Sequence, residues 1–316
     1  MSKKIFIDGA AGTTGLEIRE RLAARRDLAV VQLSDAERKD VRARKTALND
    51  ASVVILCLPD EAAREAVALI DNPEVRVIDA SSAHRVAADW AFGFPEFAPG
   101  NYENIAAAKR VTNPGCYATG FIALVAPLIR AGLLPADAAL SVNAVSGYSG
   151  GGKAMIAEFE DKTAPDYVET VVRTYALTLA HKHVPEMTER SGLRHAPVFA
   201  PSVGRYYRGM IVEVPLHLWA LPRQPSAADL RAALADTYRG RPFVEVAGEA
   251  ETASLKTLDA ELLKNTNRMK LYVFANEKTR QARLTAVLDN LGKGASGAAV
   301  QNLNVMLGLP ETTGLA

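Results

Sequence analysis

The sequence predicts an α/β protein of two domains, a parallel sheet with helices on both faces and then a mixed sheet with fewer helices. Three observations lead to this prediction. In the first third of the 316 residues, short apolar runs alternate with segments of helical periodicity. Beyond residue 115, strand-like runs follow one another more closely. Hydrophobic residues make up 48% and charged residues 23% of the chain, the balance of a globular protein.

The first domain is predicted from alternating elements. Its strand-like runs are residues 3–9, 28–33, 51–59 and 75–81. Residues 13–25 and 60–70 carry apolar side chains at helical spacing. Strands and helices that alternate in this way favour a parallel sheet covered on both faces.

The second domain is predicted from a change of pattern near residue 115. A helix is expected over residues 117–132, and another, of small and apolar residues, over 294–307. The expected strands between them are residues 139–146, 174–183, 196–202, 209–218, 243–248, 270–277 and 283–290. Successive strands with few helices between them indicate a mixed or antiparallel sheet.

Composition and charge exclude several classes of protein. The net charge of +1 provides no field to recruit nucleic acid or an anionic membrane. The apolar runs are too short to cross a bilayer, and the first residues lack a secretion signal. Two cysteines, Cys57 and Cys116, form no disulfide framework. We therefore expect a cytoplasmic enzyme acting on a small molecule.

A glycine-rich turn joins the first strand to the first helix. Gly9, Gly12 and Gly15 provide a tight turn and close backbone approach, and the helix start offers free N–H groups for a pyrophosphate. Thr13 and Thr14 lie in the same turn. The GxxGxxG spacing is one residue longer than the common dinucleotide fingerprint, and an ordinary strand–helix turn is the alternative. The turn predicts a Rossmann-type nucleotide-binding domain.

The tip of the second strand indicates which dinucleotide binds. Ser34 stands there, and a basic cluster follows it: Arg38, Lys39, Arg42 and Arg44. Hydroxyl and basic side chains suit the 2′-phosphate of NADP, whereas an acidic residue such as Asp35 would suit the ribose of NAD. We predict NADP, with a solvated charged loop as the alternative.

Cys116 is the candidate nucleophile. It follows Asn-Pro-Gly at the start of an apolar helix, where backbone N–H groups and the helix dipole favour a thiolate. A buried structural cysteine is the alternative, and it describes Cys57, inside the run VVILCLP, much better.

A reactive cysteine needs an acid–base partner, and His181 and His183 are the best placed of the five histidines. They stand at the predicted end of strand 174–183, where a period of two puts them on one face. No third ligand stands nearby, so we expect no metal. An acid–base role beside Cys116 is the better use of the pair.

Two segments suit an anionic substrate. The loop VSGYSGGGK, residues 145–153, has hydroxyl and N–H groups that could hold phosphate. The segment GRYYRGM offers Arg205 and Arg208 to a carboxylate or phosphate. Taken alone, each segment is better interpreted as a surface loop. Together with the nucleotide turn and the candidate nucleophile, the two segments indicate a site for an anionic substrate.

Taken together, these motifs resemble the N-acetyl-γ-glutamyl-phosphate reductase family in its shorter form. The resemblance runs nearly end to end and rests on IFIDGAAGTTGLEIRERL, DASSAHR, FGFPE, NPGCYATG, VSGYSGGGK, HKHVPEM, YYRGM and DNLGKGASGAAVQNLN. It implies an NADP-binding domain of residues 1–115 and 291–316. It also implies an α+β catalytic and oligomerisation domain of residues 116–290, like that of glyceraldehyde-phosphate dehydrogenase.

The resemblance also implies roles for residues. Cys116 matches the nucleophile and His183 the catalytic histidine, while His181 is assigned to the substrate. The remaining implied substrate residues are Ser146, Gly147 and Arg208. The implied cofactor residues are Gly9, Gly12, Thr13, Thr14, Gly15, Ser81 and Asn290. Ser34 and Arg38 are cofactor candidates from the residues after the second strand, because that strand's tip is less specific to the family.

The implied reaction belongs to arginine biosynthesis. It reduces N-acetyl-L-glutamyl 5-phosphate to the 5-semialdehyde and phosphate, through a thioester on Cys116, with NADPH as the reductant. The same chemistry on an aminoadipyl or aspartyl phosphate is the nearest alternative. A cysteine acyltransferase without a nucleotide and a non-catalytic nucleotide-binding regulator are more distant ones. By analogy, a homo-oligomer, either dimer or tetramer, is expected.

Overall fold

The structure is a computed structural model that describes residues 2–316. The chain forms two compact units. One contains the residues through Pro95, then Gly100–Pro114 and Ala295–Ala316. The other contains Glu96–Pro99 and Gly115–Gly294.

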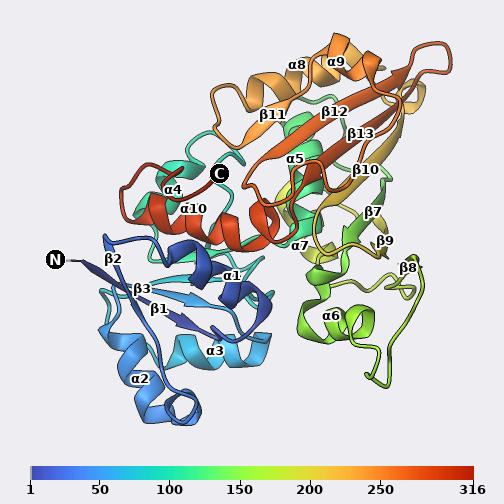
Figure 1. Ribbon diagram of the computed structural model, residues 1–316. Helices are drawn as coiled ribbons and strands as arrows, with labels where there is room; N and C mark the ends of the chain where they lie inside the picture. The colour runs from blue at the N-terminus through green and yellow to red at the C-terminus, as the bar shows by residue number, and fades with distance from the viewer. Residues whose placement is uncertain (1) are drawn as a thin grey trace. The chain divides into compact units, whose positions relative to one another are not determined.

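The first unit is built on a parallel sheet of six strands (Figure 1). The strands are β1 (Lys3–Asp8), β2 (Leu28–Val31), β3 (Val53–Leu56), β4 (Arg76–Asp79), β5 (Ala91–Phe92) and β6 (Arg110–Thr112). Their order is β2-β1-β3-β4-β6-β5, and every pairing is parallel. This confirms the parallel sheet predicted for the first third of the chain.

Helices cover both faces of this sheet, as the alternation of β1 side chains shows. Ile5 and Ile7 pack in a core with residues of α1 and α10, whereas Phe6 packs in a second core with residues of α2 and α3. The helices are α1 (Thr13–Leu22), α2 (Val41–Asp50), α3 (Asp60–Ala68), α4 (Asn101–Ala107) and α10 (Gly297–Met306), with a 3-10 turn at Glu37–Lys39. Because helices cover both faces of the sheet, its strands are buried on both sides and appear in the sequence as unbroken apolar runs.

The second unit contains a mixed sheet of seven strands in the order β11-β12-β13-β10-β7-β9-β8. The strands are β7 (Ser141–Gly147), β8 (Val172–Thr174), β9 (Val198–Gly204), β10 (Met210–His217), β11 (Val244–Val246), β12 (Met269–Asn276) and β13 (Gln281–Leu288). The pairs β7–β9 and β11–β12 are parallel and the others are antiparallel. The predicted mixed sheet is confirmed.

Helix α5 (Cys116–Arg130) is the central helix of this unit and packs against β10 and β13 (Figure 1). A Cβ on Gly120 would come within 2.9 Å of the Val212 side chain, so the helix and β10 approach very closely. The unit's other elements are α6 (Gly152–Glu160), α7 (Val184–Ser191), α8 (Ala227–Thr237), α9 (Glu249–Ser254) and 3-10 turns at Tyr148–Gly151 and Leu218–Ala220. A π-helical turn, Gly292–Ser296, leads into α10.

The predicted strand over residues 174–183 is wrong. Strand β8 ends at Thr174, and His183 instead caps the start of α7. Ala176 and Leu179 have φ values of 53° and 62°, which an extended strand cannot contain. The two histidines therefore do not share the face of a strand.

Candidate active site

Cys116 is the first residue of α5. Gly115 is the N-cap, and no side chain caps the helix start. The helix therefore begins with backbone N–H groups that lack intrahelical partners beside a half-buried thiol. Together with the helix dipole, this position favours the thiolate form.

Cys57 has the opposite environment. It follows β3, whose four residues are all buried, at the end of the parallel sheet. Burial, together with the charges of Asp79 and Asp8, raises the pKa of Cys57 to about 12. The thiol therefore stays protonated at neutral pH and is a poor nucleophile.

The backbone of Gly294 lies directly against Cys116. A Cβ on Gly294 would come within 2.7 Å of the Cys116 Cβ and 3.2 Å of the Asp289 carbonyl oxygen. Glycine is thus required here because another part of the chain approaches closely, although φ is not positive. The resemblance included this segment but assigned no role to Gly294.

We predict that Gly294→Ala lowers kcat by about 100-fold, because displacing a reacting group by an ångström has an effect of this size. Steady-state kinetics would measure this change. Gly248→Ala is the matched control, since nothing lies within 4 Å of its added Cβ, and it should keep normal turnover. A Gly294→Ala enzyme with more than half of the original kcat would contradict the packing argument.

An aromatic cluster holds His181 and His183 beside the start of α5. Tyr117 follows Cys116, and its ring centroid lies 5.9 Å from that of His181 and 5.8 Å from that of His183. The two histidine rings are 4.7 Å apart. His183 is only 5% exposed. The structure therefore brings both histidines to the neighbourhood of Cys116, although they do not lie on a strand.

The two histidines differ in their hydrogen bonds. The backbone N–H of His183 donates to Nδ1 of His181, at 3.1 Å. An accepting Nδ1 carries no proton, so in the neutral ring of His181 the proton is on Nε2. His183, as the N-cap of α7, is fixed by the helix that follows it.

Two tyrosines that the sequence reasoning missed lie in the same cluster. The Tyr175 hydroxyl donates to the Tyr117 hydroxyl at 3.1 Å, which in turn donates to the Ser202 carbonyl at 3.3 Å. Burial raises the pKa of both tyrosines well above the usual range, with further contributions from Cys116. Both hydroxyls therefore remain protonated donors. The position of Tyr117 directly after the cysteine was the available signal.

Glu186 is a second residue that the sequence reasoning missed. It is 1% exposed, and its carboxylate accepts the Gly115 N–H at 3.1 and 3.3 Å. This bond fixes α7, which begins next to His183, to the residue before Cys116. It also occupies the Gly115 N–H, so any oxyanion must use N–H groups from Cys116 onward. The HKHVPEM motif contains Glu186, but nothing in the motif indicates that this carboxylate binds the Gly115 N–H.

The predicted substrate segments meet near the end of β7. Ser146 is buried, and a Cβ on Gly147 would lie within 2.5 Å of the Tyr207 carbonyl oxygen. Asn290 connects the two segments. Its Oδ1 accepts the Gly209 N–H at 2.8 Å, and its Nδ2 donates to the Ser149 hydroxyl at 2.9 Å.

The two arginines of the GRYYRGM segment have different partners. Arg208 donates to Asn265 Oδ1 at 2.9 Å and lies 3.6 Å from the carboxylate of Asp289. Arg205 instead donates to the carbonyls of Phe159 and Thr170. Arg205 thus ties loops together, and Arg208 is held at the segment that contains Asn290.

In the first unit, the glycine turn has two glycines that the fold itself requires. Gly9 has a φ of +86°, and its Cβ would lie 2.2 Å from the Cys57 carbonyl oxygen. A Cβ on Gly15 would lie 2.5 Å from the Gly9 carbonyl oxygen. Gly12 differs, since its Cβ would meet nothing closer than 3.5 Å. The space beside Gly12 therefore remains open to an incoming ligand.

Polar groups at this turn also fit a nucleotide. Helix α1 starts without a side-chain cap, and the buried Thr13 hydroxyl has no hydrogen-bond partner. Free N–H groups and an unsatisfied hydroxyl suit a pyrophosphate. Ser81, near the end of β4, instead donates its hydroxyl to Asp79 at 2.7 Å.

The loop after β2 is partly paired within itself. The Ser34 hydroxyl donates to Glu37 at 2.6 Å, and Arg38 lies 3.2 Å from Asp35. Arg44 is bound to the nearly buried Asp8 at 2.8 Å. Ser34 and Arg38 thus share one short loop, while Arg44 stabilises the end of β1.

Within residues 2–316, no helix is long and apolar enough to cross a membrane. Over the same described range, no group of three or more His, Cys, Asp or Glu side chains is arranged to hold a metal ion.

Comparisons with known proteins agree with this geometry. Residues 4–106 match the family model "Semialdehyde dehydrogenase, NAD binding domain", and residues 116–290 match "Semialdehyde dehydrogenase, dimerisation domain". The solved structure of aspartate semialdehyde dehydrogenase II from Vibrio cholerae covers 97% of this chain and 98% of its own, with a TM-score of 0.70 at 15% identity. That likeness confirms the predicted fold.

Curated relatives are much closer in sequence. The N-acetyl-gamma-glutamyl-phosphate reductase of Brucella ovis is 55% identical over 98% of this chain and 100% of its own. The protein of the same name from Brucella anthropi is also 55% identical, over 98% of this chain. These matches confirm the predicted resemblance and favour it over the aminoadipyl or aspartyl alternative. The chain belongs to the N-acetyl-gamma-glutamyl-phosphate reductase family, a group of oxidoreductases among the semialdehyde dehydrogenases.

Proposed function

We propose that this chain reduces N-acetyl-L-glutamyl 5-phosphate to N-acetyl-L-glutamate 5-semialdehyde and phosphate, with Cys116 as the nucleophile. The observation that carries the proposal is the position of Cys116 at the uncapped start of α5, beside the cluster of Tyr117, His181 and His183. The names of the curated relatives supply the substrate.

In the first step, the Cys116 thiolate attacks the acyl carbon. A C–S bond forms and the bond from that carbon to the phosphate oxygen breaks, which leaves a thioester and inorganic phosphate. Backbone N–H groups from Cys116 onward would stabilise the tetrahedral oxyanion. Glu186 supports this geometry because it binds the preceding N–H and fixes α7 to the start of α5.

In the second step, the thioester is reduced and the sulfur leaves. A reduced nicotinamide, when bound, would supply the hydride for this reduction. His183 donates the proton that the departing sulfur takes up, which restores the thiol and releases the aldehyde. His181, whose Nδ1 is engaged by the His183 backbone, would donate from Nε2 to the substrate. Ser146, Gly147 and Arg208 would hold the anionic groups of the substrate.

The first unit would bind the dinucleotide. Gly9, Gly12, Thr13, Thr14 and Gly15 would surround its pyrophosphate, and Gly12 has no steric need of its own to be glycine. Ser81 would support the site through Asp79. Asn290, in the second unit, would serve the nicotinamide end. With this assignment, residues 1–115 and 291–316 form the cofactor domain and residues 116–290 the catalytic and oligomerisation domain.

We infer NADP rather than NAD because Ser34 and Arg38 stand together in the loop after β2, where the Arg38 N–H donates to the Ser34 carbonyl at 3.0 Å. A hydroxyl and a guanidinium suit a 2′-phosphate, and Asp35 is already paired with Arg38. We also propose a homo-oligomer, dimer or tetramer, since the second unit matches a model described as a dimerisation domain. A cytoplasmic location fits a chain with only two cysteines, which are too few for a disulfide framework.

The reverse reaction tests substrate and cofactor together. With N-acetylglutamate semialdehyde and phosphate, we expect the absorbance of reduced nicotinamide to rise with NADP, much faster than with NAD. Omitting phosphate should stop the reaction, since phosphate is needed to release the acyl group. If aspartate semialdehyde reacted and N-acetylglutamate semialdehyde did not, the proposed mechanism would stand and the proposed substrate would be wrong.

The Arg38→Ala variant sharpens the test of cofactor preference. Because the variant lacks the guanidinium that would bind the 2′-phosphate, the KM for NADP should rise about tenfold or more, and the KM for NAD should stay unchanged. Arg26→Ala is the matched control, because Arg26 is exposed and precedes β2, at its opposite end from Ser34. Equal effects on both cofactors would argue against a 2′-phosphate contact.

A further inference from the structure

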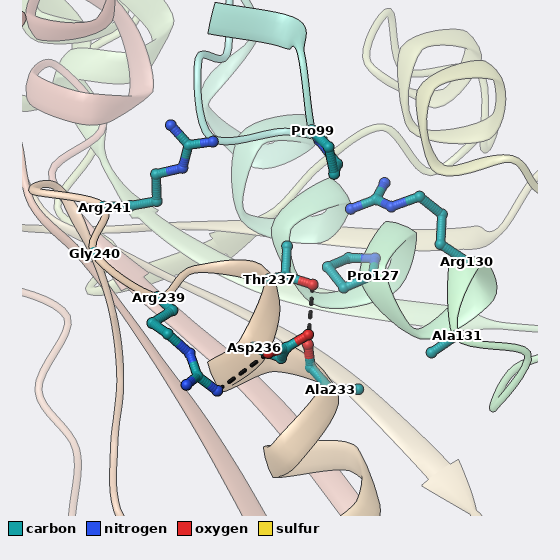
Figure 2. A pocket seen from close by; sticks show the side chains of 10 residues that line it. All are labelled: Pro99, Pro127, Arg130, Ala131, Ala233, Asp236, Thr237, Arg239, Gly240 and Arg241. Atoms are coloured by element: carbon teal, nitrogen blue, oxygen red, sulfur yellow. Dashed lines mark hydrogen bonds and ion pairs between the residues drawn. The ribbon is translucent and has the colours of Figure 1, made fainter.

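A basic pocket lies in the second unit, at the end of α5 that is away from Cys116. Its volume is about 700 Å³, within the range of small-molecule sites. The last turn of α5, the end of α8 and Pro99 line it (Figure 2). Cys116 and Arg130 are the first and last of the 15 residues of α5, so about 20 Å of helix separates them.

The charge of this pocket is strongly one-sided. Arg130, Arg239 and Arg241 line it, and Asp236 is the one acid among the lining residues described. Asp236 lies 3.1 Å from Arg239, and both side chains are about four-fifths exposed. Figure 2 shows the pair of Asp236 and Arg239 directed away from Pro99, while the guanidinium groups of Arg130 and Arg241 lie nearer to Pro99, one on each side of it.

Arg241 and Arg130 differ in the hydrogen bonds that their side chains already make within the protein. Arg241 takes part in no side-chain hydrogen bond or ion pair with any residue from 2 to 316. Arg130 is held in place, because it donates to the Phe97 carbonyl at 2.8 Å and lies 5.3 Å from the centre of the Phe97 ring. One bond leaves most of its five N–H donors free for another partner.

The wall that contains Pro99 is also firmly anchored. Glu96 is fully buried and accepts two bonds from Lys293, at 2.8 and 2.9 Å. A buried ion pair of this kind resists displacement of the segment 96–99. The site is thus preorganised, which reduces the entropy lost when a ligand binds.

We propose that this pocket is a second ligand site, distinct from the Cys116 centre, that binds a small dianion between Arg130 and Arg241. The shared chemistry is a pair of anionic oxygens that accept forked hydrogen bonds from guanidinium groups, as a phosphate or a dicarboxylate does. Such a ligand would neutralise the charges of Arg130 and Arg241, which form no ion pair with an acid among residues 2–316.

The first test uses phenylglyoxal, which modifies accessible arginines, with peptide mass spectrometry of the full chain. Phosphate and succinate are the two probes, against chloride at equal ionic strength. We expect either probe to slow modification of Arg241 and Arg130 at least fivefold, with Arg239 unchanged. Protection by one probe alone supports the site and identifies its ligand as a phosphate or a dicarboxylate. If neither probe slowed modification of Arg241 and Arg130 relative to chloride, or if Arg239 were slowed equally, the proposal would be overturned.

The second test measures binding calorimetrically with the better probe. Arg241→Gln should weaken this binding about tenfold or more, the loss that removal of one charged hydrogen-bond partner produces. Arg239→Gln removes the same charge from the outward-facing neighbour and should change the dissociation constant less than twofold. Equal weakening in both variants would indicate a general charge effect and would refute the site. Unchanged basal turnover of both variants would show that they remain folded.

Discussion

Cys116→Ala should abolish turnover, with a loss of at least about 10⁴-fold, since removal of a covalent nucleophile leaves only binding and electrostatic contributions. Alanine removes Sγ and retains the start of α5, because Gly115 remains the N-cap and Glu186 still accepts its N–H. Binding of the reduced cofactor should be nearly intact, because the glycine turn is untouched. Steady-state assay and fluorescence titration of the reduced cofactor would measure the two quantities.

Cys57→Ala is the matched control for this variant. Its thiol has a pKa raised to about 12 and serves no step, so turnover should stay within about twofold of normal. A thiol reagent at neutral pH should likewise modify Cys116 in the native protein and spare Cys57. Substantial residual activity in Cys116→Ala would exclude the thioester route.

The first unit could be predicted well because its information is local. Strands such as Val53–Leu56 are buried on both faces and therefore appear as unbroken apolar runs. The glycine turn is similarly local, since Gly9 needs its positive φ and Gly15 approaches the chain six residues earlier. A pattern in a short stretch of sequence was enough to find both.

The error over residues 174–183 has a physical explanation. Alternating apolar residues such as Leu177 and Leu179 resemble a half-buried strand, yet they are 79% and 56% exposed. Periodicity indicates a strand only when one face is buried, and the sequence alone does not show which apolar residues find partners. Here the chain turns away after Thr174, and the segment ends in the N-cap of α7.

The residues of the candidate site that the sequence did not predict make contacts with residues far away in the chain. Glu186 and Gly115 are 71 positions apart, and Tyr175 and Tyr117 are 58 apart. Gly294 lies against Cys116 although the two residues are 178 positions apart in the sequence. Motifs identified residues whose chemistry is intrinsic, such as a thiol or an imidazole. They did not identify residues whose role is to hold those groups in place.

His183→Asn should lower kcat by about 10²–10⁴-fold, the usual effect of losing an acid–base group. Asparagine is well accepted at an N-cap, so α7 should still begin at Val184 and Glu186 should keep its bond to Gly115. The KM for the acyl phosphate should fall rather than rise, because the covalent intermediate accumulates when departure of the sulfur becomes slow. Steady-state kinetics across a pH series would separate these effects.

His181→Asn is the matched comparison, since the two rings lie 4.7 Å apart and share Tyr117 as a neighbour. His181 accepts the His183 N–H through Nδ1, so its replacement should act mainly on substrate binding and raise KM. The decline of kcat at high pH, where an acid is deprotonated, should persist in His181→Asn and disappear in His183→Asn. A loss below tenfold in His183→Asn, with a large loss in His181→Asn, would transfer the acid role to His181.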